Sequence, residues 1–230
     1  MRVSFASKLA RALGTGAAAV VLAAAWLAAP SAHAQDPQRG AKLFQFCTQC
    51  HGADAGGNPQ FLAPNLTGLP EWYLVAQLKN FHTGLRGMHP DDVAGMRMFP
   101  MTRVFRDEGD IPAVAAHIAQ LPVVTPAPTI SDGDATRGAS FYQVCIACHG
   151  PDGRGNQALN APPLVQESDW YLLSSLQRYK DGVRGNDPRN ANAQIMRGMA
   201  GTLADEQAMK DVITYIKSLG GAQAAQAPAQ

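Results

Sequence analysis

Residues 47–52 read CTQCHG, and residues 145–150 read CIACHG. These two hexapeptides hold all 4 cysteines of the 230-residue chain, and in each a histidine directly follows a Cys-x-x-Cys pair. Cysteines three residues apart on a helical turn point to the same side of it, so each pair presents two thiols to one neighbouring group. The two hexapeptides therefore predict two equivalent sites, each with two thiols and one imidazole.

Cys-x-x-Cys-His is the attachment pattern of c-type haem, in which the thiols form thioether bonds to the porphyrin and the histidine binds the iron. The predicted residues are Cys47, Cys50 and His51 in the first motif, and Cys145, Cys148 and His149 in the second. Structural zinc would need ligands from a second cluster, and a thioredoxin-like pair would need a βαβ context that this sequence lacks. Two disulfides, which four cysteines would otherwise suggest in an exported chain, leave the adjacent histidines unexplained.

The two motifs belong to a longer internal repeat, in which each matching residue lies 98 positions further along the chain. The matches include RGAKLFQFC at 39–47 with RGASFYQVC at 137–145, APNL at 63–66 with APPL at 161–164, WYL at 72–74 and 170–172, and GLRG at 84–87 with GVRG at 182–185. No gap is needed between 39–121 and 137–219. This tandem duplication predicts two similar domains, at 35–121 and 137–219.

The first 34 residues have the features of an export signal. Arg2, Lys8 and Arg11 precede an apolar run, and AHA at 32–34 is a small-residue cleavage pattern. We expect cleavage after Ala34 and export to the periplasm. Because the apolar run approaches the length needed to cross a bilayer, a retained membrane anchor is the alternative.

Two further segments fall outside the repeats. Residues 122–136 contain three prolines, which lack helical amide hydrogens and favour extended backbone, so we expect a semi-extended linker. The tail at 220–230 is made of small, uncharged residues and is predicted to be disordered.

Each repeat is expected to be all-α, with helices joined by loops and without alternating strand patterns. Three helices are predicted in each: one that ends at the cysteine motif, one that begins at WYL, and a final amphipathic helix. Asp36 and Asp134 are expected to start the first helix of each repeat. A glycine in each first helix, Gly40 or Gly138, is expected to allow close packing against the final helix. A covalent haem would add the apolar volume that a domain of this size lacks.

The whole pattern resembles class I cytochrome c, and two such domains in tandem behind an export signal resemble the diheme cytochrome c₄ family. The resemblance covers most of residues 36–219. It implies two tandem class I cytochrome c domains, each a small helical bundle around a covalent haem c. It also implies a methionine as the second axial ligand of each iron, supplied from a loop after the middle helix.

The 98-residue offset narrows the choice of methionine. Met98 pairs with Met196, and Met101 pairs with Met199, whereas Met88 and Met96 have no repeated partner. The family uses the first methionine of such a pair, so the resemblance implies Met98 and Met196 as ligands, with Met101 and Met199 as runners-up. The second methionine of each pair is expected to fill core space.

The resemblance also implies residues that act around the haem. Class I cytochromes fix the ligating imidazole with a proline carbonyl, which here would be Pro64 and Pro162. Arg86 and Arg184 either contact haem propionates or are solvated loop charges. A basic group in the second repeat is either a docking face or a solvated face, and consists of Arg178, Lys180, Arg184 and Arg189.

The predicted function is electron transfer, with no catalytic residue. Two closed irons would carry electrons from a quinol-oxidising complex or a dehydrogenase to a terminal oxidase in the periplasm. The formal charge of +1 gives no electrostatic case for nucleic acid or strong membrane binding. The alternatives are a diheme enzyme of the thiosulfate-oxidising or peroxidase type, which needs an open iron, and a cytochrome subunit of a larger membrane complex.

Overall fold

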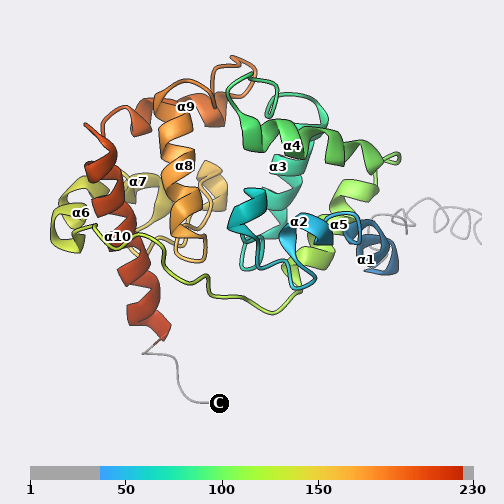
Figure 1. The fold of residues 1–230 in the computed structure, drawn as a ribbon, viewed down its shortest axis with the longest axis horizontal. Helices are drawn as coiled ribbons and strands as arrows, with labels where there is room; N and C mark the ends of the chain where they lie inside the picture. The colour runs from blue at the N-terminus through green and yellow to red at the C-terminus, as the bar shows by residue number, and fades with distance from the viewer. Residues whose placement is uncertain (1–36, 225–230) are drawn as a thin grey trace, which may run out of the picture. The chain divides into compact units, whose positions relative to one another are not determined.

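The computed structural model describes residues 37–224, which form two helical halves in tandem (Figure 1). The first half contains α1 (Pro37–Phe44), α2 (Thr48–His51), η3 (Pro59–Phe61), α3 (Glu71–His82), α4 (Val93–Met101), η4 (Thr102–Val104) and α5 (Asp110–Ala119). The second contains α6 (Ala135–Tyr142), α7 (Ile146–His149), η5 (Gln157–Leu159), α8 (Asp169–Lys180), α9 (Ala191–Ala200) and α10 (Glu206–Ala224). These residues form no strand, only isolated bridges in each half. The all-α expectation and the tandem arrangement are confirmed.

The helix count per repeat differs from the expectation. Each half has one further α-helix, α4 or α9, where we expected a loop. Side-chain caps explain why helix forms there: Asp92 accepts a hydrogen bond from Gly95 N at 2.9 Å, and Asn190 accepts one from Ala193 N at 3.2 Å. Such caps satisfy amide groups at a helix start that otherwise lack a partner.

The first and last helices of each half cross at a glycine, as expected. A Cβ at Gly40 in α1 would lie 2.2 Å from Ala113 O of α5, and one at Gly138 in α6 would lie 2.0 Å from Asp211 O of α10. Next to these crossings, Phe44 and Tyr142 are almost fully buried in the two main cores. The capping role predicted for Asp134 is also confirmed, because its carboxylate accepts bonds from the amides of Thr136 and Arg137.

One arginine that occurs at the same position of both repeats binds different partners in the two halves. Arg39 bonds to Asp110 at the start of α5, whereas Arg137 bonds at 2.7 Å to Asp211 in the second turn of α10. The two aspartates are not related by the 98-residue offset. Both carboxylates are buried, so each arginine ties the first helix of its half to the last by a charge-assisted hydrogen bond.

The connection between the halves is extended, and it is anchored at both ends. Val124 N donates to Thr67 Oγ1 in the first half at 2.9 Å. Thr129 N and Ile130 N donate to the Asp169 carboxylate in the second half at 2.6 and 2.8 Å. The connection thus holds fixed contacts with both halves.

Two expectations concern the ends of the chain. The helix α10 continues to Ala224, so residues 220–224, which we expected to be disordered, are helical. The predicted export signal at 1–34 and Asp36 lie outside the described residues. Of the helices between 37 and 224, none combines the length and the apolar character that crossing a membrane requires.

Candidate functional site

Each cysteine motif closes a short helical turn. In α2, His51 N donates to Cys47 O at 2.9 Å, and in α7 His149 N donates to Cys145 O at the same distance. The turn brings Cys47, Cys50 and His51 to one cavity in the first half, and Cys145 and His149 to one cavity in the second. No disulfide joins these cysteines within the described residues, so all four thiols are available for thioether bonds.

A proline carbonyl fixes each imidazole. His51 Nδ1 lies 2.9 Å from Pro64 O, and His149 Nδ1 lies 2.9 Å from Pro162 O. Both rings are buried, and this burial lowers the pKa of both histidines. A neutral imidazole that donates from Nδ1 has its Nε2 lone pair available to a metal.

Tight turns carry these prolines to the rings. Gly57 has φ of 88° and Gly155 has φ of 80°, in the left-handed region that favours glycine. A Cβ at Gly57 would lie 2.6 Å from both Pro64 C and Asn65 N, and one at Gly155 would meet the backbone of Pro162 at 2.5 Å. Glycine in the repeated GN pair is therefore required for the proline carbonyl to reach the histidine.

Two cavities lie at the cysteine motifs. The larger, of about 930 Å³, is lined by Cys145 and His149 together with Met196 and Met199. The smaller has a volume of about 130 Å³. It is lined by Cys47, Cys50, His51, Met98 and Met101 of the first half. In both halves the histidine, the first cysteine of the motif and both methionines of the M-x-x-M pair therefore line one cavity.

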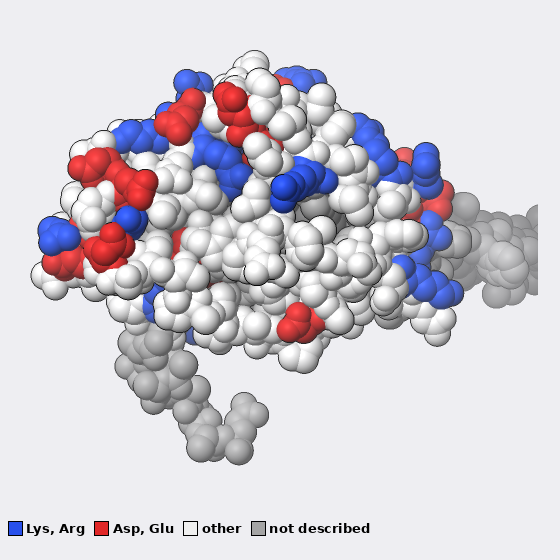
Figure 2. Space-filling model, viewed as in Figure 1, with Lys and Arg blue, Asp and Glu red and all other residues white. Residues whose placement is uncertain are grey.

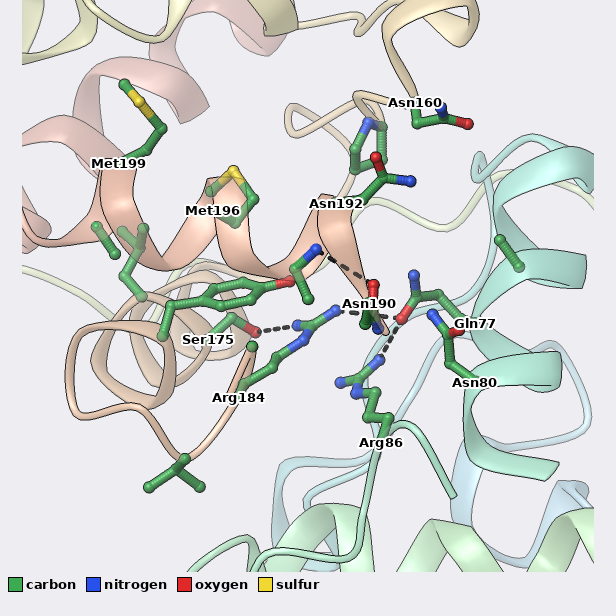
Figure 3. Close-up of a pocket in the computed structure, with 18 of the residues that line it drawn as sticks. Gln77, Asn80, Arg86, Asn160, Ser175, Arg184, Asn190, Asn192, Met196 and Met199 are labelled. Carbon is green, nitrogen blue, oxygen red and sulfur yellow. Dashed lines mark hydrogen bonds between the residues drawn. The ribbon is translucent and has the colours of Figure 1, made fainter. Parts of the chain in front are cut away.

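The methionines lie on helices, which corrects the expectation of a loop. Met98 is on α4 and Met196 is on α9, and each is half-buried against a hydrophobic core cluster. Met101 is 38% exposed in the chain alone and lines the same cavity as Met98, so the packing role expected for it stays a prediction. Figure 3 shows Met196 and Met199 projecting from successive turns of α9.

The two loop arginines meet at Gln77. Arg86 donates to Gln77 Oε1 at 2.8 Å, and Arg184, from the other half, donates to the same oxygen at 3.1 Å (Figure 3). Arg184 is 7% exposed and stacks on the Tyr179 ring, while Arg86 also donates to Tyr171 Oη at 2.7 Å. The interpretation of these arginines as solvated loop charges is therefore wrong.

One buried atom at this junction lacks a partner. Within residues 38–220, Arg86 Nε is the one buried side-chain nitrogen or oxygen without a hydrogen-bond partner. Buried polar atoms are nearly always hydrogen-bonded, so an orphaned guanidinium nitrogen indicates an acceptor that the protein itself does not supply. Its position between the two cavities fits a group with carboxylates, such as haem.

Two cations of the basic group in the second repeat have partners within the molecule. Arg178 forms an ion pair with Asp92 of the first half at 3.2 Å, and Lys180 donates to the backbone oxygens of Leu203 and Ala204. Lys and Arg side chains are interspersed with Asp and Glu on the face in Figure 2, with no segregated basic region. Arg178 and Lys180 are thus engaged inside the molecule, whereas Arg189 is 71% exposed and pairs with Asp187, so a docking role for this group stays a prediction.

Sequence reasoning missed the residues that join the two halves. Tyr171 carries a signal, because it repeats Tyr73 in the WYL motif. Gln77 matches Ser175, and Glu167 matches Leu69, so these polar residues occur in one half only and the repeat gives no hint of them.

The fold and its paired sites define a c-type cytochrome with two haem-binding halves. Comparison with known proteins agrees, because the profile of the family described as Cytochrome c matches residues 37–122 and 135–220. The chain belongs to the cytochrome c family. It is a diheme electron carrier that binds two haem c groups covalently through the cysteine pairs at 47/50 and 145/148.

Individual relatives are similar over most of the chain. The thiosulfate dehydrogenase electron acceptor of Thiomonas intermedia (strain K12) is 34% identical over 181 residues, which cover 74% of this chain and 77% of that protein. Cytochrome c4 of Stutzerimonas stutzeri is 29% identical over 198 residues, covering 82% and 91%. The crystal structure of reduced recombinant cytochrome c4 from Pseudomonas stutzeri matches with a TM-score of 0.64 at 25% identity, over 80% of this chain and 98% of that one.

Proposed function

We propose that each iron is closed by one histidine and one methionine, His51 with Met98 and His149 with Met196. The observation that supports this assignment is that each histidine shares a cavity with its methionine. A soft thioether opposite a neutral imidazole keeps an iron low-spin, favours the reduced state and leaves no position for a substrate. The runners-up Met101 and Met199 face the same cavities.

The propionates of the two haems are proposed to lie at the junction of the halves. Arg86 and Arg184 carry guanidinium groups there, and Arg86 Nε has a free donor. A carboxylate next to two guanidinium groups is held by charge-assisted hydrogen bonds, which would anchor the propionates at this junction.

With both irons closed, the protein carries electrons between respiratory redox proteins and performs no bond chemistry. The proposed donors are a quinol-oxidising complex or a dehydrogenase, and the proposed acceptor is a terminal oxidase. The similarity to a thiosulfate dehydrogenase electron acceptor supports a dehydrogenase as one donor. Two irons allow two electrons to be held in one molecule or relayed from one half to the other.

Periplasmic location is part of this proposal. Residues 1–34 would act as the export signal, 35–121 and 137–219 as the two domains, and 122–136 as the linker, whose last two residues already belong to α6. Mass spectrometry of the exported protein should give a chain that starts at Gln35 and carries two haems. A chain that retains Met1 would instead favour an anchored cytochrome subunit of a membrane complex.

The decisive experiment is a carbon monoxide challenge of the reduced holoprotein. We expect no binding by the wild type, binding at one haem in Met98→Ala, and none in the matched control Met101→Ala. Met98→Ala should also lower the potential of that haem and remove about half of the thioether-to-iron absorption band. If Met101→Ala opened the iron instead, the ligand assignment would be wrong while the carrier function would stand. Stoichiometric binding by the wild type would refute the carrier and favour the diheme enzyme.

A further inference from the structure

Glu167 is a buried carboxyl at the junction of the two halves. Its side chain belongs to the loop before α8, the residue is 6% exposed, and it lines both cavities. The equivalent position in the first half is Leu69, so the carboxyl has no counterpart there. Neither its placement nor its charge is needed to bind the haem through the cysteine motifs.

Among residues 38–220, no cationic side chain forms an ion pair with the Glu167 carboxylate. Ser168 N donates to Oε1 at 2.9 Å. The Lys217 ammonium group is held by the backbone oxygens of Val165 and Glu167 itself, at 2.7 and 2.6 Å.

Several charged or titratable groups nevertheless face this carboxyl from the elements packed around it. They are Lys217 on α10, Arg86 and Arg184 in the loops after α3 and α8, and Tyr171 on α8. The three cations favour the carboxylate, whereas desolvation opposes it and is the largest effect, so that burial raises the pKa of Glu167 to about 8. Because desolvation and the nearby cations act on this carboxyl in opposite directions, a change in a nearby charge changes its protonation.

We propose that Glu167 is a proton-binding site coupled to electron transfer, which takes up a proton when the protein is reduced and releases it on oxidation. This proposal rests on the diheme carrier function. The redox donor supplies the electron, the solvent supplies the proton, and one O–H bond forms on the Glu167 carboxylate. Each electron accepted next to the junction adds one negative charge in a region of low dielectric, which favours the neutral carboxylic acid.

The sign of the pH dependence follows from this coupling. Below the pKa of the oxidised protein the carboxyl is protonated in both redox states, and above the pKa of the reduced protein it is ionised in both. Between these limits reduction takes up a proton, so the midpoint potential falls as the pH rises. Because the first half has Leu69 instead, this site binds at most one proton per molecule.

The test is a spectroelectrochemical titration of the holoprotein over roughly pH 6 to 10, a range that brackets the raised pKa of the carboxyl. Wild type should show a midpoint potential that falls with pH in part of this range, and Glu167→Gln should lose that fall. Glu167→Leu, which introduces the side chain found at Leu69, should do the same. The matched control Glu206→Gln, at a carboxylate 55% exposed in the same half, should retain it.

A second readout separates protonation from a structural effect. Reduction should produce the carbonyl band of a protonated carboxyl in the infrared difference spectrum of wild type, and this band should be absent from Glu167→Gln. A fall in potential that persists in Glu167→Gln would assign the proton to another group, such as a haem propionate, and overturn the proposal. A wild type without any pH dependence would also overturn it, whereas the carrier function depends on the carbon monoxide result alone.

Discussion

The crossing of α6 and α10 at Gly138 allows a stability prediction to be worked out from distances. A methyl group at this position would lie 2.0 Å from Asp211 O and 2.5 Å from Asp211 C. Both atoms belong to the backbone of a long helix and cannot rotate away as a side chain would. Gly138→Ala must therefore push α6 away from α10 by more than 1 Å to restore a contact of about 3.4 Å.

The expected cost is the difference between two terms. Overpacking costs about 1–3 kcal/mol, and the rigid backbone neighbour favours the upper end of that range. The higher helix propensity of alanine adds about 1 kcal/mol to the free energy of unfolding relative to glycine. The net effect of Gly138→Ala is therefore a loss of about 2 kcal/mol in the free energy of unfolding. Gly198 on α9 is the matched control, because a methyl group there has no neighbour within 4 Å and should gain up to about 1 kcal/mol.

Thermal unfolding of the two holoprotein variants measures this difference. In a chain of this size Gly138→Ala should lower Tm by about 4–8 °C, and Gly198→Ala should raise it by about 2–4 °C. Because α6 leads into the second cysteine motif, Gly138→Ala should also reduce haem incorporation in that half. If both variants shifted Tm upward, the close approach of α6 and α10 would be wrong.

Two further predictions concern charges. Asp92→Asn leaves the half-buried Arg178 without its anionic partner and should cost about 3–5 kcal/mol, measured by denaturant unfolding; an unchanged midpoint would mean that this ion pair does not join the halves. The hydrogen bond from Arg137 lowers the pKa of Asp211 to about 2, so this carboxylate stabilises the fold above its ordinary pKa of 3.8, and the stabilisation is lost as the pH falls through about 2. In Asp211→Asn the free energy of unfolding should therefore depend less on pH between about 2 and 3.8. An unaltered pH dependence would contradict the stabilising role of the Asp211 carboxylate.

The repeat itself made most of the fold predictable. Residues that matched at the 98-residue offset, such as Phe44 with Tyr142 and Val114 with Val212, form the cores of the two halves. Helical periodicity and the offset are both local properties of the sequence, so they identify helices and the glycine crossings without knowledge of tertiary structure.

The helices that carry the methionines were not predictable in the same way. Both α4 and α9 are short, and α4 contains Pro100, which argues against helix when the sequence is considered alone. A proline in the final turn of α4 and a capping Asp92 at its start allow the helix to form. The local signals conflict, and only packing against α3 resolves them.

Contacts between the halves were the least predictable part of the candidate site. Gln77 joins Arg86 to Arg184, although these residues come from different repeats and their sequence neighbours suggest exposed loops. The internal repeat predicts the residues that both halves share, whereas the contacts between the halves use residues that differ between the repeats. Glu167 and Asp92 are both such differences.

The anchored linker limits how far the two halves could ever separate. Val124 is held by the first half and Thr129 by the second, so only residues 125–128 are free to extend. The five residue steps from Val124 to Thr129 span at most about 18 Å when fully stretched. A tether of this length keeps each half at an effective concentration in the millimolar range around the other. At this effective concentration, contacts that are weak by the standards of free association keep the two halves together, so the proposed electron relay between them needs no diffusive encounter.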